Sequence, residues 1–211
     1  METKKHIEET KKHIENVISR TYKIIQSVYE HQKEAEGRKS GAPEPLSRII
    51  YPQYRKEGCT RFSEQELRFV FVEQLNKEIQ DGWDVYYSVE TPTKKRYKFK
   101  GEEHPKVFDE NEKGGQSAQF DLVIHDNKYQ RIALIEFKAN NSPAKDHEKD
   151  FVKLNSEGSD TILTYFLEIV KSSDGGTTNN LEEKNKTFNG DFRCWSCSER
   201  KFIIKKVLFS I

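Results

Sequence analysis

The stretch FDLVIHDNKYQRIALIEFKA, residues Phe120–Ala139, decides the fold that this sequence predicts. Its two apolar halves flank a short Asp-Asn-Lys sequence at 126–128. This pattern is typical of two antiparallel strands joined by a tight turn. The second half carries Glu136 and Lys138 inside its apolar run. Charges in a protein core are unfavourable unless they are paired or bind a metal ion, so these two residues need an explanation.

Strand periodicity places the charged side chains of this hairpin on one face. Successive strand residues point to opposite faces, so Glu136 and Lys138 share a face and Phe137 lies opposite. A hairpin loop of two or four residues places Asp121 across from either Leu134 or Glu136. In both cases the carboxylates of Asp121 and Glu136 lie about 5–8 Å apart at Cβ, with Lys138 beside them. Two such carboxylates repel each other unless a cation lies between them, and oxygen ligands suit Mg²⁺ or Mn²⁺.

The order Asp121, fourteen intervening residues, then Glu136-Phe137-Lys138 resembles the PD-(D/E)XK nuclease superfamily. The resemblance covers about residues 62–153. It implies a restriction-endonuclease-like α/β fold, with a central mixed β-sheet flanked by helices. It also implies that Asp121 and Glu136 bind Mg²⁺ (or Mn²⁺) and that Lys138 assists the attacking water. The family pattern names a proline next to the aspartate, whereas Phe120 precedes Asp121 in this chain.

A helix predicted over residues 62–79 supplies the remaining acidic candidate. Members of the superfamily often use a glutamate from the helix before the hairpin as a further metal ligand. Glu64 and Glu66 compete for this role. Ser63 followed by Glu66 matches a capping box, which explains Glu66 without a metal, so Glu64 is the predicted ligand. A first-turn acid favoured by the helix dipole remains the alternative explanation for Glu64.

The N-terminal segment predicts one long amphipathic helix within residues 1–37, because ETKKHIE occurs twice in succession and Ile7, Ile14 and Val28 are spaced in multiples of seven. The helix either docks on its own domain or forms a homodimer. The Gly- and Pro-containing segment at 37–45 separates it from a predicted nuclease domain over residues 46–211. Further elements are a strand at 83–91, a helix at 141–155, and strands at 161–170 and 200–211.

Other polar groups admit two explanations each. The predicted helix at 141–155 is expected to expose Asp146, His147, Asp150 and Lys153 to solvent, although His147 or Lys153 could reach a bound phosphate. The basic segment at 94–100 predicts either a solvated edge strand or a ribbon for a nucleic-acid backbone. Cys194 and Cys197 have a zinc-like spacing, but no second pair of ligands accompanies them, which disfavours a zinc site.

Composition sets wider limits. The chain has 34% charged residues, 34% hydrophobic residues and a net charge of +1, so any nucleic-acid surface is expected to be local. We expect a cytoplasmic protein without a membrane partner, because no signal peptide or spanning run is visible and the three cysteines are too few for a disulfide scaffold. The predicted function is a Mg²⁺-dependent nuclease acting on nucleic acid, with DNA as the expected substrate. The alternative is a catalytically inactive nuclease-fold module that binds nucleic acid or protein.

Overall fold

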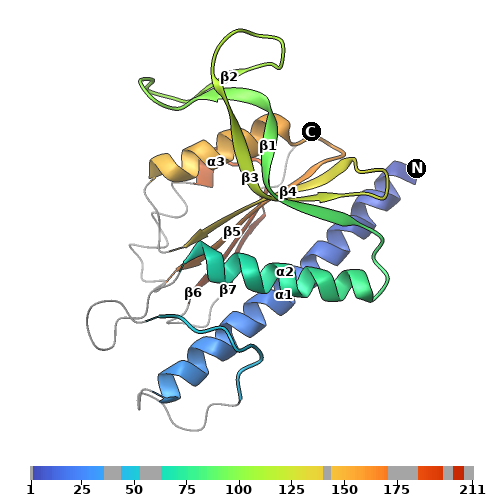
Figure 1. Ribbon diagram of the computed structural model, residues 1–211, viewed down its shortest axis with the longest axis vertical. Helices are drawn as coiled ribbons and strands as arrows, with labels where there is room; N and C mark the ends of the chain where they lie inside the picture. The colour runs from blue at the N-terminus through green and yellow to red at the C-terminus, as the bar shows by residue number, and fades with distance from the viewer. Residues whose placement is uncertain are drawn as a thin grey trace.

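The computed structural model places the predicted hairpin at the centre of a mixed sheet (Figure 1). It describes residues 2–35, 44–52, 63–139, 144–170, 185–196 and 202–206. Strands β3 (Gln116–His125) and β4 (Arg131–Ala139) pair antiparallel, with Leu122 opposite Ile135. The Asp126 carboxylate accepts hydrogen bonds from the backbone N–H groups of Lys128 and Gln130, at 2.9 and 2.8 Å, and so closes the predicted turn.

Seven strands form the sheet in the order β2-β1-β3-β4-β5-β6-β7. Strands β4, β5 and β6 run parallel to one another, and all other neighbours are antiparallel. This confirms the α/β class and the mixed sheet. The remaining strands are β1 (Tyr86–Lys98), β2 (Lys106–Phe108), β5 (Leu163–Val170), β6 (Asp191–Ser196) and β7 (Phe202–Lys206). A short 3-10 helix, η1 (Asn185–Thr187), precedes β6.

Helices cover both faces of the sheet. The helices α1 (Glu2–Ala35) and α2 (Glu64–Gln80) lie on one face, and α3 (Ala144–Glu157) lies on the other (Figure 1). Each face has its own hydrophobic core. The core under α1 and α2 includes Ile18, Phe71, Leu122, Ile135 and Phe137. The core under α3 includes Val123, Leu134, Phe151, Leu154 and Phe166. Leu134 and Ile135 lie in the cores on opposite faces of the sheet, which confirms the alternation of side chains predicted for the hairpin.

The predicted elements agree with the structure apart from their ends and two omissions. Strand β1 begins at Tyr86 and continues through Lys98, so it includes most of the basic segment at 94–100. The predicted cap of α3 at residues 142–143 lies outside the described residues. Strands β2 and β6 were not predicted. Strand β2 has only three residues, and β6 has six residues with a charged Arg193 in its middle, so neither shows a clear hydrophobic period.

Helix α1 packs its apolar stripe against the sheet and α2, which confirms the docked alternative. The stripe is wider than a two-position coiled-coil seam, because Ile18 and Ile25 are buried beside the predicted seam residues Ile14 and Val17. A stripe of this width is typical of a helix on a globular core. The Tyr22 hydroxyl donates to the backbone carbonyl of Arg193 in β6, at 3.2 Å, and ties the middle of α1 to the sheet.

The predicted division at residue 37 lies outside the described residues, but α1 and the predicted nuclease domain share one hydrophobic core. The apolar face of α1 is occupied within the chain, so a homodimer through this helix stays a prediction that would require another surface. Among the described segments, none of the helices combines the length and the apolar character needed to cross a bilayer.

Glu78 of α2 is the main polar link between the two helices on this face. Its buried carboxylate accepts hydrogen bonds from His13 Nδ1 at 2.7 Å and from the Asn16 amide, and it forms an ion pair with Arg20. The His13 ring also stacks on Trp83, with ring centroids 4.9 Å apart. Burial alone would raise the pKa of Glu78, but the contacts with His13, Asn16 and Arg20 outweigh it and hold this pKa below its ordinary value.

We expect Glu78→Gln to destabilise the protein at neutral pH by roughly 1–3 kcal/mol, the usual range for hydrogen bonds to a charged group. A lowered pKa means that the carboxylate stabilises the fold above its ordinary pKa of about 4.3 and loses this contribution as the pH falls through the lowered value. Denaturant unfolding at pH 7 and pH 3 should therefore show a difference between variant and wild type that shrinks in acid. Glu73→Gln, which removes an exposed pair with Lys77, is the matched control and should change stability little.

Candidate active site

The buried charges that the sequence predicted lie where β4 runs between β3 and β5. Every residue from Ile132 to Phe137 is buried, and Glu136 is only 2% exposed. Leu134 belongs to the core under α3, so alternation directs Glu136 and Lys138 toward α3 as well. The position of Glu136 in a central strand leaves it no access to solvent along the sheet. Its charge must be balanced by groups from α3 or from neighbouring strands.

Asp121 lies beside this part of β4, as the hairpin register predicted. The β3–β4 ladder pairs Leu122 with Ile135, so one further step places Asp121 opposite Glu136. The Asp121 Oδ2 atom accepts a hydrogen bond of 2.8 Å from the backbone N–H of Phe137. This contact fixes the Asp121 carboxylate beside the backbone that joins Glu136 to Lys138. The structure therefore brings the first three predicted site residues together.

Lys138 has different partners from those expected. Its ammonium lies 2.9 Å from Asp150 Oδ2 and 3.5 Å from Glu64 Oε1, instead of between Asp121 and Glu136. Glu64 extends from the first turn of α2 and has a side chain that is 42% exposed. Glu66 instead accepts hydrogen bonds from the backbone N–H and the hydroxyl of Ser63, which completes the predicted capping box. Of the two competing glutamates, Glu64 is therefore the one that reaches Lys138.

The prediction that α3 exposes its polar residues is wrong for three of the four. His147, Asp150 and Lys153 are buried against the sheet, and only Asp146 is substantially exposed. Lys153 Nζ lies 2.5 Å from Glu136 Oε1 and 2.8 Å from Asp150 Oδ1. Asp150 therefore bridges the two lysines, with one oxygen toward Lys138 and the other toward Lys153. We refer to Glu64, Asp121, Glu136, Lys138, Asp150 and Lys153 as the β4 charge cluster.

A pattern in the sequence could have revealed these α3 residues. Phe151 and Leu154 form the apolar stripe of the helix, and both are fully or almost fully buried. His147 lies one turn before Phe151, and Asp150 lies one turn before Leu154, so both fall on the same helical face as the stripe. Their positions on the apolar face indicated burial, whereas the solvated-face interpretation considered only their polarity.

A second buried pair continues the contacts between α3 and the sheet. His147 Nε2 lies 3.1 Å from Glu168 Oε2, and both side chains are 0% exposed. Glu168 of β5 is the register partner of Lys138 and also of Cys194 in β6. Each of these polar residues of α3 thus contacts a charged residue of the sheet: Lys153 contacts Glu136, Asp150 contacts Lys138, and His147 contacts Glu168.

The β4 charge cluster contains more negative than positive groups. Four carboxylates (Glu64, Asp121, Glu136 and Asp150) and two ammonium groups (Lys138 and Lys153) give a formal charge of −2 when all are ionised. Burial, together with the carboxylates of Asp150 and Asp121, raises the pKa of Glu136 well above its usual range in spite of Lys153. Burial and neighbouring carboxylates likewise raise the pKa of Glu64. The excess of carboxylates over lysines therefore leaves an electrostatic repulsion that this side-chain arrangement does not relieve.

This imbalance fits a divalent cation in both charge and ligand type. A net charge of −2 would be neutralised by one Mg²⁺ or Mn²⁺, and carboxylate oxygens are the ligands these ions prefer. Among the described residues, Asp121 Oδ1 and Glu136 Oε2 make no hydrogen bond or ion pair, which leaves one oxygen of each for a ligand. No three His, Cys, Asp or Glu side chains of the described segments are gathered closely enough to hold an ion unaided, because lysines lie between the carboxylates.

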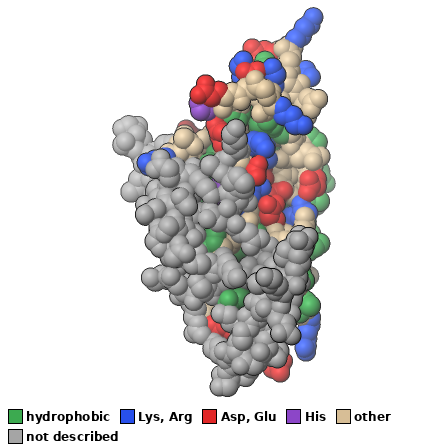
Figure 2. Space-filling model, turned by 90° about the vertical axis from the view of Figure 1, so that its left-hand side faces the viewer, with side chains coloured by type: hydrophobic (Ala, Val, Ile, Leu, Met, Phe, Trp, Pro, Cys, Tyr) green, Lys and Arg blue, Asp and Glu red, His purple; other side chains and the backbone are tan. Residues whose placement is uncertain are grey.

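The basic segment of β1 lies on an arm formed with β2 and β3 (Figure 1). Two of its cations pair with nearby acids. Lys95 pairs with Asp109 at 3.4 Å, and Lys98 pairs with Glu102 at 2.7 Å. Figure 2 shows acidic and basic groups interspersed among the described side chains on the side of the molecule that it faces. A nucleic-acid backbone on this ribbon therefore stays a prediction.

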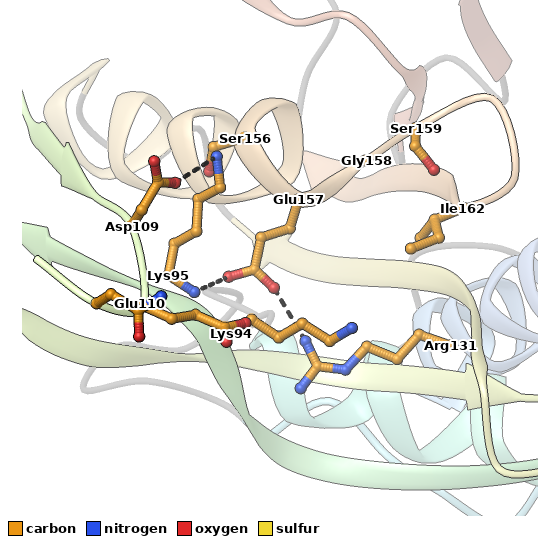
Figure 3. A pocket seen from close by; sticks show the side chains of 11 residues that line it. Lys94, Lys95, Asp109, Glu110, Arg131, Ser156, Glu157, Gly158, Ser159 and Ile162 are labelled. Atoms are coloured by element: carbon orange, nitrogen blue, oxygen red, sulfur yellow. Dashed lines mark hydrogen bonds and ion pairs between the residues drawn. The ribbon is translucent and has the colours of Figure 1, made fainter.

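A hollow of about 480 Å³ lies between this arm and the end of α3 (Figure 3). Glu157 occupies its wall and accepts hydrogen bonds from the backbone N–H of Lys95 at 2.8 Å and from Arg131 at 2.9 Å. The Tyr97 hydroxyl contacts Ser156 at 2.7 Å. These contacts show that Glu157 anchors the arm to α3, and they give its carboxylate partners within the chain.

The described part of the chain gives the zinc alternative no support. Cys194 is buried in β6 and belongs to the core under α3, and Cys197 lies outside the described residues. Comparisons with known proteins found no matching family model, no similar curated protein and no similar solved structure. The candidate site therefore depends on the geometry of the β4 charge cluster alone.

We expect Asp121→Asn to raise the melting temperature in metal-free buffer at neutral pH. The amide oxygen can still accept the hydrogen bond from Phe137, while one of four mutually repelling charges is removed. A gain of about 1 kcal/mol would raise the midpoint by about 2–4 °C for a chain of this size. Calorimetric melting would measure the change.

Glu110→Gln, which removes an exposed acid remote from the cluster, is the control and should leave the midpoint unchanged. In millimolar Mn²⁺ the wild type should instead melt at a higher temperature than Asp121→Asn, because only the wild type would gain the full free energy of ion binding. A lower midpoint for Asp121→Asn without metal would show that this carboxylate stabilises the fold, and would contradict the charge imbalance.

Proposed function

We propose that this protein is a divalent-metal-dependent nuclease with a restriction-endonuclease-like fold, which hydrolyses phosphodiester bonds and has DNA as its expected substrate. The observation that carries the proposal is the arrangement at one end of β4, where Asp121 lies beside the buried Glu136 and Glu64 pairs with Lys138, in a partly buried cluster with a formal charge of −2. The mixed sheet, covered by helices on both faces, supports the same proposal, because the resemblance to the PD-(D/E)XK superfamily implies such a sheet.

The proposal gives each residue a distinct role. Asp121 and Glu136 would hold Mg²⁺ or Mn²⁺ through carboxylate oxygens, and Glu64 would add a ligand from α2. The bound ion would supply Lewis-acid activation of the phosphate and of the attacking water. Asp121 is suited to its role because the backbone of Phe137 already orients its carboxylate. The Glu64 side chain is 42% exposed, so a substrate could reach it from solvent.

Lys138 would act as a fixed positive charge. Burial would lower the pKa of Lys138, but the carboxylates of Asp150 and Glu64 raise it above its usual range. The side chain therefore stays protonated at neutral pH and can donate hydrogen bonds to a phosphate oxygen or orient water. It would not serve as a general base. This role matches the assistance by lysine that the family resemblance implies.

One observation favours the second candidate, a catalytically inactive module that binds nucleic acid or protein. Both lysines of the cluster are ion-paired with its carboxylates, so the charges are partly neutralised within the chain. The two candidates differ in whether a divalent ion can enter the cluster. Ion binding and cleavage therefore separate them directly.

Purified protein should be incubated with plasmid, linear duplex DNA, single-stranded DNA and RNA, each with Mg²⁺, Mn²⁺ or EDTA. The nuclease proposal expects metal-dependent cleavage of at least one substrate, with the DNA forms favoured. Calorimetry should show Mn²⁺ binding that Asp121→Ala and Glu136→Ala each weaken. Undiminished Mn²⁺ binding in both variants would remove the ion from this site, and binding of nucleic acid without cleavage would favour the inactive module.

We expect Lys138→Ala to bind Mn²⁺ but to cleave roughly 100-fold more slowly, the usual scale for losing one electrostatic contact at a transition state. Asp150 keeps Lys153 as a partner in this variant, so folding should persist. Lys138→Arg should restore little activity, because a planar guanidinium does not replace a compact ammonium.

Single-turnover cleavage at saturating metal, paired with a melting curve, would measure this effect. Lys149→Ala is the matched control, since Lys149 is a partly exposed lysine of α3 that pairs with Asp146 outside the cluster. Cleavage by Lys138→Ala at the wild-type rate would exclude the lysine from the mechanism.

A further inference from the structure

The ammonium of Lys153 is enclosed by oxygen atoms in the way that a bound cation would be. Its Nζ lies 2.5 Å from Glu136 Oε1, 2.8 Å from Asp150 Oδ1 and 2.8 Å from the backbone carbonyl oxygen of Gln119. The Phe120 ring closes another side, with its centroid 5.8 Å from Nζ, where the ring face attracts a positive charge. Lys153 itself is only 7% exposed.

These three oxygens come from three separate elements: β4, α3 and β3. They include a main-chain carbonyl oxygen, which is not protonated at ordinary pH and therefore stays available as a ligand. Such oxygens commonly coordinate metal ions. Their distances to Nζ exceed the 2.0–2.1 Å that is usual for Mg²⁺ and approach the 2.3–2.6 Å that is usual for Ca²⁺. A metal ion could therefore replace the ammonium with small movements of the surrounding oxygens.

We infer that Lys153 permanently fills one of two adjacent cation positions that share Glu136. The neighbouring position, between Asp121 and Glu136, is the one assigned to a divalent ion under the proposed function, on which this inference builds. The chain's own ammonium thus takes the place of a second metal ion. The wild-type protein accordingly binds a single divalent ion in the β4 charge cluster.

The charges of the cluster agree with this occupancy. With Lys153 present, the formal charge is −2, which one divalent ion neutralises. A second divalent ion would bring the same cluster to +2 and would be repelled by Lys138 and Lys153. Without Lys153 the cluster would carry −3, and three oxygens that now contact the ammonium would lose their partner. Such a buried, unpaired set of oxygens is unfavourable and would attract a cation.

The test is the number of ions bound by Lys153→Ala compared with the wild type. Both proteins should be titrated calorimetrically with Mn²⁺ and with Ca²⁺, and the bound metal should be counted after gel filtration. We expect one additional equivalent in the variant, for at least one of the two ions. Equal numbers in the variant and the wild type for both ions would overturn the inference.

Two further variants serve as controls. Lys153→Arg keeps a positive charge near the same oxygens and should bind no additional ion. Lys149→Ala removes an α3 lysine outside the cluster and should also leave the count unchanged. An additional ion in Lys149→Ala would contradict the assignment to Lys153, because the gain would then follow from the charge of the helix alone.

Folding of the variant is a second measurement. Lys153→Ala should melt at a lower temperature than the wild type without metal and should recover most of the difference in millimolar Ca²⁺ or Mn²⁺. If Lys153→Ala does not fold in either buffer, the number of bound ions should be measured in Lys153→Gln. One additional ion in that variant would support the inference, and no additional ion would contradict it.

The outcome is separable from that of the proposed function. A wild-type protein that binds no divalent ion would contradict the nuclease proposal, whereas the inference about Lys153 is judged by the difference between variant and wild type. A wild type that binds two ions in the cluster, with no gain in Lys153→Ala, would leave metal-dependent cleavage intact and overturn the inference.

Discussion

The burial of Glu136 in a central strand constrains much of the surrounding structure. Its neighbours β3 and β5 close both edges of β4, so the charge must be balanced by side chains on the same face, from α3 or from the neighbouring strands. Lys153 provides this balance from α3, and Asp150 in turn pairs with Lys153 and Lys138. Each of these contacts requires α3 to lie at one fixed position along the length of β4. The polar pairs thus set the register between helix and sheet, while Phe151 and Leu154 supply the apolar contacts.

Replacing a buried ion pair with apolar residues of similar size is often neutral or stabilising, so stability alone does not explain such a cluster. A purely structural network would also be expected to balance its charges. Here four carboxylates face two lysines, and Glu136 responds with a raised pKa. The repulsion among these carboxylates is relieved either by protonation or by a cation. The excess of carboxylates makes the β4 charge cluster a stronger candidate for ion binding than the balanced contacts around Glu157 or Glu78.

The sequence predicted those parts of the site that depend on local periodicity. Asp121 and Glu136 lie on one hairpin, so strand alternation and a short turn were sufficient to bring them together. The capping box was likewise predictable, because the contact between Ser63 and Glu66 spans three residues. The partner of Lys138 could not be predicted in this way. Asp150 reaches it from α3, and the placement of that helix follows from packing between distant segments.

Helix α1 shows the same limit of prediction from a local sequence pattern. Its doubled heptad predicts an apolar stripe, but the stripe fits a second helix or a sheet equally well until the partner is known. The structure supplies a sheet, and the contacts of Tyr22 and Glu15 with Arg193 join segments more than 170 residues apart. Arg193 also explains why β6 was not predicted, because a charged residue in the middle of a short strand obscures the hydrophobic pattern of that strand.

The two faces of the sheet therefore differ in what their buried charges can do. Under α1 and α2, Glu78 is surrounded by donors and its pKa is lowered, so the charge is already satisfied within the chain. Under α3, the donors are too few and the pKa of Glu136 is raised. Burial contributes most to the raised pKa of Glu136, and the carboxylates of Asp150 and Asp121 raise it further in spite of Lys153. Glu78 has enough donors to offset its burial, whereas Glu136 lies among more carboxylates than lysines. An excess of negative charge is what a cation-binding site requires before its ion arrives.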